Sequence, residues 1–278
     1  MPKSLLVILS TLVLAPVSLF PAGISVDAGL TPAQNRWIFR TQMRYMQRRD
    51  DPTAMNREMV TVAAPLVVAY GVTPSLTLMA REILIRRNMI MGGSGTITYG
   101  RSDILAMAKY KLLRRNTRHS SLGVAAVLGL EPPLGSGKFT SETWDLVTGL
   151  NGSFRFDALA IDGDMRAVWN GIGERDTRSG DVLSLNVAAA YRFAVGTGAA
   201  VAFAPVLESG FTFVSRDIVD GAEKEATGES VAYVSPGAKL TVSSFIVEAL
   251  LQIPTWQDRP STALSRGVGG LVGIRVML

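Results

Sequence analysis

The alternation of apolar and charged residues over residues 144–171 constrains the fold more than any other feature of this sequence. Even positions in its first half are almost all apolar or small, whereas Asp145 and Arg155 occupy odd positions. Side chains of a β-strand point alternately to opposite faces, so a period of two predicts a strand with one apolar and one charged face. The alternation resumes after a short turn near Asp157 and continues to Trp169. These residues therefore predict a long two-stranded hairpin.

The same period of two recurs along the rest of the chain. The expected strands cover residues of about 35–46, 57–70, 75–87, 102–113, 121–131, 144–156, 159–169, 181–193, 200–214, 230–242, 245–253 and 267–278. Their connections alternate between short turns and longer polar loops, which is typical of a barrel whose two ends differ in loop length. We therefore expect an all-β fold, a single transmembrane antiparallel up-and-down β-barrel of about twelve strands, over residues 29–278.

A soluble β-protein is the alternative fold. Hydrophobic residues make up 47% of the 278 residues. Beyond the N-terminus, however, no apolar run approaches the roughly 18 to 20 residues that a membrane helix needs. Apolar residues dispersed over alternating segments of about ten residues are typical of membrane barrels. A soluble sandwich or solenoid gives no reason for loop length to alternate, so the pattern favours the membrane barrel.

The N-terminal residues have the composition of a signal peptide. Lys3 supplies a positive charge, and residues 5–14 form an apolar core of the length found in secretory signals. The small residues Val26 and Ala28 stand at the positions expected before a cleavage site. We predict a signal peptide over residues 1–28, with cleavage after Ala28, and export to the outer membrane of a Gram-negative bacterium. A helical membrane anchor is the alternative interpretation of this segment.

Charged residues of both signs lie on the polar face of the expected strands. A Lys or Arg that faced lipid at the midplane would cost about 2 to 4 kcal/mol, so these side chains should point into the barrel. The candidate lumen-lining residues are Arg40, Arg44, Arg81, Asp103, Lys109, Lys111, Arg155, Asp162, Asp164, Arg166, Arg192, Glu208, Lys239, Glu248, Gln252 and Arg275. They predict either a lumen that sorts solutes by charge or a salt-bridged interior that only holds the barrel shut.

Composition argues against several other functions. The chain has no Cys, which excludes a thiolate metal site or a Cys nucleophile. Calcium is conceivable at the acidic residues of one loop, Asp217, Asp220, Glu223 and Glu225, but ordinary solvation is the favoured interpretation, so we expect no metal and no cofactor. The net charge of +5 is spread over many segments, which is unlike a nucleic-acid-binding surface. The single histidine, His119, lies beside Ser120 and Ser121 in an expected turn, so a barrel-embedded lipid hydrolase stays an alternative. Otherwise we expect no enzyme activity.

Several segments are similar to a known family. They are Gly100 and Asp103 followed by residues 108–112, the LGLEPPLGSG segment at 128–137, the YVSPG segment at 233–237, and residues 248–254. Together they resemble the outer-membrane barrel family named after the meta-pathway of phenol degradation. The resemblance implies an outer-membrane transporter of hydrophobic or aromatic compounds, surrounded by outer-membrane lipids and inserted by the barrel-assembly machinery. We expect a channel for passive passage of small molecules. A structural or surface-interaction barrel without transport is the other alternative.

Overall fold

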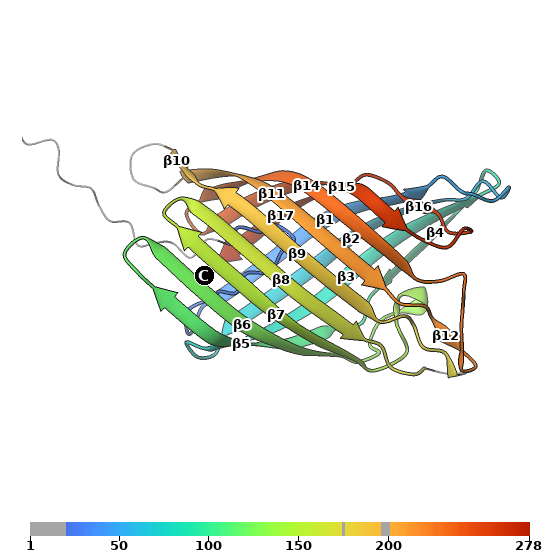
Figure 1. Ribbon diagram of the computed structural model, residues 1–278, viewed down its shortest axis with the longest axis horizontal. Helices are drawn as coiled ribbons and strands as arrows, with labels where there is room; N and C mark the ends of the chain where they lie inside the picture. Colours follow the sequence, from blue (N-terminus) through green and yellow to red (C-terminus); the bar gives the residue numbers. More distant parts are fainter. Residues whose placement is uncertain (1–20, 174–175, 196–200) are drawn as a thin grey trace, which may run out of the picture.

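The computed structural model describes residues 21–173, 176–195 and 201–278. Within these residues, twelve long strands form the wall of a closed antiparallel barrel (Figure 1). The wall strands are β1 (Trp37–Arg49), β2 (Glu58–Gly71), β3 (Leu76–Met91), β5 (Leu105–Asn116), β6 (Ser120–Glu131), β7 (Asp145–Phe156), β8 (Leu159–Trp169), β9 (Val182–Tyr191), β11 (Val201–Val214), β14 (Glu229–Val242), β15 (Phe245–Asp258) and β17 (Gly269–Met277). Each pairs with the next wall strand of the chain, and β17 pairs with β1 to close the sheet. The predicted twelve-stranded barrel is confirmed.

Shorter elements lie at the ends of the wall. They are β4 (Ser94–Arg101), β10 (Phe193–Val195), β12 (Ile218–Val219), β13 (Ala222–Glu223), β16 (Ser265–Arg266) and the 3-10 helix η1 (Gly137–Phe139). No helix among the described residues is long and apolar enough to cross a membrane. The predicted apolar core of the signal peptide, residues 5–14, lies outside the described part of the chain.

The residues between the expected strands 75–87 and 102–113, which the sequence suggested would be a polar loop containing Gly92 and Gly93, instead form a hairpin. Strand β3 continues to Met91, the chain reverses at Gly92 and Gly93, and β4 returns alongside β3. Both glycines have positive φ, at 56° and 84°. A two-residue hairpin turn that matches the twist of its strands needs positive φ at both central positions, which glycine adopts without strain. The glycines therefore form the turn, and the residues on either side of them form the two strands of the hairpin.

The two ends of the barrel differ as the sequence predicts. Short turns at 72–75, 117–119, 157–158 and 243–244 gather at one end with the C-terminus, which we call the turn end (left in Figure 1). Long connections at 50–57, 132–144, 170–173, 176–181, 215–228 and 259–268 gather at the opposite end, which we call the loop end. The β3–β4 hairpin also extends from the loop end.

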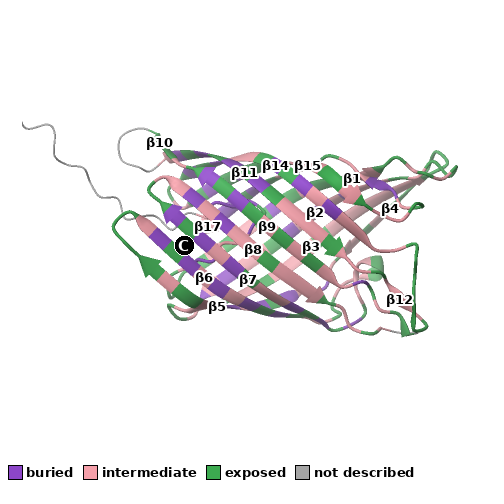
Figure 2. Cartoon of the chain, in the orientation of Figure 1, coloured by how far each residue is buried: buried purple, intermediate pink, exposed green. Residues whose placement is uncertain are grey.

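Exposure alternates along the wall strands (Figure 2). On β7, Leu146 and Leu150 point outward and are exposed, whereas Asp145, Asn151 and Arg155 are buried. The outer face is therefore apolar and the charged residues point inward, as in a barrel surrounded by lipid.

Aromatic side chains lie near both rims of the outer face. Near the turn end, Trp37 stacks on Phe39 with ring centroids 5.9 Å apart, and it is tilted against Tyr70 with ring centroids 4.5 Å apart. Trp144 and Trp169 are exposed near the loop end. Such aromatic girdles mark the two membrane interfaces of a barrel.

The outward position of Leu150 can be tested by placing a charge there. Leu150 lies at the middle of β7, so Leu150→Arg should destabilise the folded barrel in lipid vesicles by about 2 to 4 kcal/mol. Leu146→Arg is the matched control, because it lies four residues nearer the loop end on the same face and should cost about 0 to 1 kcal/mol. Urea unfolding followed by heat modifiability on gels measures both. Equal losses for the two variants would contradict the assigned depth.

Candidate functional site

Residues 21–34 precede β1, and we call them the lumenal segment. Residues 21–32 are mostly buried inside the barrel, and Ala33 and Gln34 are exposed at the turn end. Ala22 and Ile24 are fully buried. They pack in an apolar cluster with inward-facing residues of β8, β9, β11 and β15, among them Ala188 and Ala190. Small inward side chains on β9 leave the space that a chain segment needs. The alternation of apolar and charged residues, which predicts the wall strands, does not predict this segment.

The backbone of the lumenal segment is bound by charged side chains of the wall. Asp162 on β8 accepts hydrogen bonds from the N–H groups of Ala22 and Gly23. Glu208 on β11 accepts hydrogen bonds from the N–H groups of Ile24 and Ser25. Burying a carboxylate is costly unless hydrogen-bond donors replace its water shell. The N–H groups of the segment provide those donors.

Two lysines bind the carbonyl groups of the same segment. The Lys239 ammonium group donates to the carbonyl oxygens of Pro21 and Ala22. The Lys109 ammonium group donates to the carbonyl oxygens of Ala28 and Leu30, the latter at 3.1 Å. Carboxylates of the wall thus bind N–H groups of the segment and lysines of the wall bind its carbonyl groups. These contacts fix the position of the segment in the lumen.

Glycine and aspartate place the middle of the segment against the wall. The Gly29 N–H group donates to the Ser153 hydroxyl oxygen at 2.7 Å. A Cβ atom at Gly29 would lie 2.6 Å from the carbonyl oxygen of Gly123 on β6, so a larger residue could not approach as closely. Asp27 forms an ion pair with Arg166, and its N–H group donates to Asp164 at 2.8 Å.

Glu248 on β15 is the centre of a second buried network. It forms ion pairs with Arg40 at 2.8 Å and with Arg275 at 3.1 Å. The amide group of Gln42 donates to the same carboxylate at 2.7 Å. Through these contacts, β15 holds inward-facing side chains of β1 and β17, the two strands where the sheet closes.

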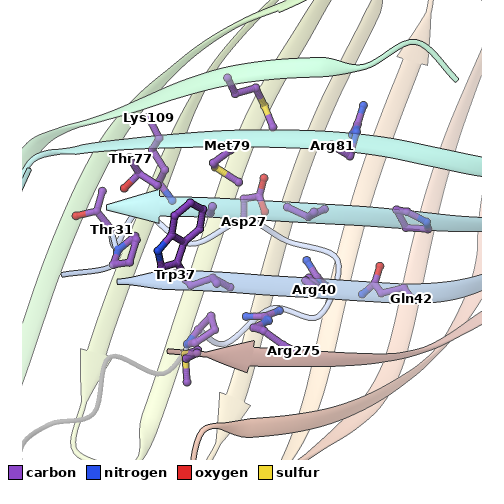
Figure 3. Close-up of a pocket in the computed structure, with 18 of the residues that line it drawn as sticks. Asp27, Thr31, Trp37, Arg40, Gln42, Thr77, Met79, Arg81, Lys109 and Arg275 are labelled. Atoms are coloured by element: carbon purple, nitrogen blue, oxygen red, sulfur yellow. The ribbon is translucent and has the colours of Figure 1, made fainter. Parts of the chain in front are cut away.

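A cavity of about 830 Å³ lies between the lumenal segment and the wall formed by β1, β2, β3 and β5, and we call it the basic chamber (Figure 3). It reaches the turn end, where Ser243 and Ser244 line it. Its basic lining residues are Arg36, Arg40, Arg44, Arg81, Lys109, Arg166 and Arg275, and Asp27 is the lining carboxylate. Apolar lining residues include Ile38, Val67, Met79, Ile83, Met107 and Met277. The chamber therefore combines positive charge with an apolar surface.

The sixteen candidate lumen-lining residues fall into three groups. Arg40, Arg44, Arg81, Lys109, Arg166 and Arg275 line the basic chamber. Asp162, Asp164, Glu208 and Lys239 bind the lumenal segment, Arg155 pairs with Asp162, and Glu248 joins Arg40 to Arg275. Asp103, Lys111, Arg192 and Gln252 lie away from the chamber and from the segment.

These four residues have other surroundings. Asp103 binds the loop after β6 at the loop end, where it accepts hydrogen bonds from Gly135 and Ser141. Lys111 donates to the carbonyl oxygen of Pro74 at the turn end. Arg192 follows β9 at the turn end, and Gln252 pairs with Gly269 on β17.

Sequence reasoning missed the lumenal segment and the contacts that Asp27, Gln42 and Ser153 make inside the barrel. The small residues around Asp27 predicted a processing site, and that prediction is not tested by the positions of residues 21–28. Gln42 and Ser153 were uncharged residues on the expected inner face, and the alternation was the one signal that could have singled them out.

His119 has an acidic neighbour that the sequence did not predict. Its Nδ1 atom lies 3.1 Å from the Oδ1 atom of Asp157, and both side chains are exposed at the turn end. The two residues come from neighbouring turns that are 38 residues apart in the chain. Among the described residues, no serine hydroxyl forms a hydrogen bond with His119, and no group of three His, Cys, Asp or Glu side chains could hold a metal ion.

The attachment of the lumenal segment can be tested with single cysteines, because the chain has none of its own. Val26→Cys is buried in the segment and should react slowly with a water-soluble maleimide. Adding Glu208→Ala removes the acceptor of two N–H groups, worth about 1.5 to 3 kcal/mol, and should raise the labelling rate about 10-fold or more. Glu82→Ala, at the loop end, should leave the rate unchanged. Intact mass spectrometry first establishes that the purified chain retains residue 26.

Comparison with solved structures supports a membrane barrel. The crystal structure of the COG4313 outer membrane channel from Pseudomonas putida F1 is similar with a TM-score of 0.69 and 14% sequence identity, over 91% of this chain and 100% of that chain. The β domain of the Bordetella autotransporter BrkA is similar with a TM-score of 0.52 and 13% identity, over 89% of this chain and 100% of that chain. At these identities the likeness concerns the fold. A search of curated proteins gives no match.

A closed antiparallel barrel with an apolar outer face and aromatic girdles is the architecture of bacterial outer-membrane proteins. The protein is therefore an outer-membrane barrel, as the sequence predicts. The family model described as MetA-pathway of phenol degradation matches residues 61–266, most of the 278-residue chain. The chain belongs to this family.

Proposed function

We propose that this protein is a passive outer-membrane channel for small hydrophobic or aromatic molecules. The observation that carries the proposal is the basic chamber, a cavity of about 830 Å³ inside a closed barrel. Its volume lies in the range of small-molecule sites, which is roughly 300 to 1,000 Å³. Its methionine, isoleucine and valine side chains offer an apolar surface to such a molecule.

The similar fold of the Pseudomonas putida F1 protein, described as an outer membrane channel, supports the same proposal. In outer-membrane barrels the short turns face the periplasm and the longer loops face the exterior. On this orientation the basic chamber reaches the periplasmic end of the barrel. The lumenal segment lines one side of this chamber and fills part of the lumen, so we expect it to limit the space that a solute can use.

A structural barrel without transport is the second candidate. It is favoured by the lumenal segment itself, whose hydrogen bonds to Asp162 and Glu208 fill part of the lumen. A lipid hydrolase has less support, because the His119–Asp157 pair has no hydrogen-bonded serine among the described residues. In this proposal the protein is not an enzyme.

Conductance in planar lipid bilayers separates the channel from the structural barrel. We compare refolded protein that begins at Pro21 with refolded protein that begins at Gly29. Both forms should conduct, and the form beginning at Gly29 should conduct more, because it lacks the residues bound by Asp162, Glu208 and Lys239.

Deletion of residues 219–226, also eight residues, is the control, because it shortens a loop outside the lumen. Heat modifiability establishes that each form is folded. Folded protein that gave no current and no solute-driven liposome swelling in either form would overturn the channel proposal.

A further inference from the structure

The charges that line the basic chamber do not balance. The ion pairs of Arg40 and Arg275 are to Glu248, and that of Arg166 is to Asp27. Arg44 donates to the neutral amide oxygen of Gln42 instead. In the described part of the chain, no carboxylate lies within 4.0 Å of the guanidinium groups of Arg44 or Arg81. These two arginines are therefore a surplus of positive charge.

The register of the sheet places Arg81 in one row with Arg40 and Arg275, which share the single carboxylate of Glu248. Arg275 pairs with Arg40 across β17 and β1. Arg40 pairs with Val67 on β2, and Val67 pairs with Arg81 on β3. These residues form one row across four neighbouring strands, and all of them line the chamber. A row of like charges between walls of low dielectric concentrates anions from solution.

Apolar side chains surround Arg81 in the same part of the wall. Met79 and Ile83 precede and follow it on the inner face of β3, and Val67 is its partner on β2. A guanidinium group binds a carboxylate through two parallel hydrogen bonds. Methionine, valine and isoleucine cannot bind the charged end of a ligand, but they can contact its apolar part.

We propose that the basic chamber binds small amphiphilic monocarboxylates, of which an aromatic carboxylate such as benzoate is the simplest. Arg81 binds the carboxylate, Arg44 adds positive charge, and Val67, Met79 and Ile83 contact the apolar part. This inference rests on the proposed function and names the chemical class of its solute. It holds also if the mature chain begins at Gly29, because that cleavage removes Asp27 and leaves both arginines.

Calorimetric titration of the folded full-length mature protein with benzoate tests this inference without any transport step. Benzoate should bind, and Arg81→Gln should weaken it about tenfold or more, since hydrogen bonds to charged groups are worth at least that factor. Arg44→Gln is a second variant, with a smaller expected loss, in case Arg81→Gln does not fold. Lys111→Gln is the control, because Lys111 is a basic residue that does not line the chamber. It should bind benzoate as the unaltered protein does.

Three other probes separate charge from apolar contact. Benzyl alcohol, which has the ring without the charge, should bind more weakly than benzoate. Acetate and inorganic phosphate, which have charge without an apolar part, should also bind more weakly. Benzoate affinity that is unchanged in both arginine variants, or equal affinity for benzyl alcohol, would overturn the inference.

The two proposals fail in different ways. Benzoate binding without any current or solute flux would reject the channel and leave the carboxylate site standing. Current or flux without benzoate binding would leave the channel standing and reject the site.

Discussion

The hydrocarbon core of the membrane offers no hydrogen bonds, and this constraint determines the rest of the structure. Each backbone group of a membrane-spanning strand must find its partner in a neighbouring strand, so the sheet has to close on itself. Pairing of β17 with β1 achieves that closure. The same constraint sends Leu150 outward and Arg155 inward, because lipid accepts the first side chain and excludes the second.

Charged side chains that point inward need partners, because several of them are buried away from water. Asp162 and Lys239 are almost completely buried. Their partners include backbone groups of the lumenal segment, which offers N–H donors to the carboxylate and carbonyl acceptors to the ammonium group. Each residue of a peptide backbone other than proline carries one N–H donor and one carbonyl acceptor. One segment of chain can therefore satisfy wall residues of either charge.

The balance of charge differs between the two sides of the lumenal segment. On the side of β8 and β11, the carboxylates of Asp162 and Glu208 bind the segment. On the side of β1 and β3, arginines are in excess, and Arg44 and Arg81 have no carboxylate within reach among the described residues. The segment thus divides the polar lumen in two. On one side the charged groups bind the segment, and on the other side arginines outnumber carboxylates. The carboxylate site that we propose lies in the half where arginines are in excess.

The sequence by itself determined the wall: twelve strands, their inner and outer faces, and the alternation of turns and loops. It could do so because the membrane imposes a period of two that is visible within each strand. Tertiary structure decided what the charges do. Lys109 and Lys239 bind carbonyl groups that lie between 79 and 218 residues away in the chain, and Asp157 meets His119 across two separate turns. The period of two within a strand cannot predict such contacts, because they form only when the closed barrel brings distant strands around one lumen.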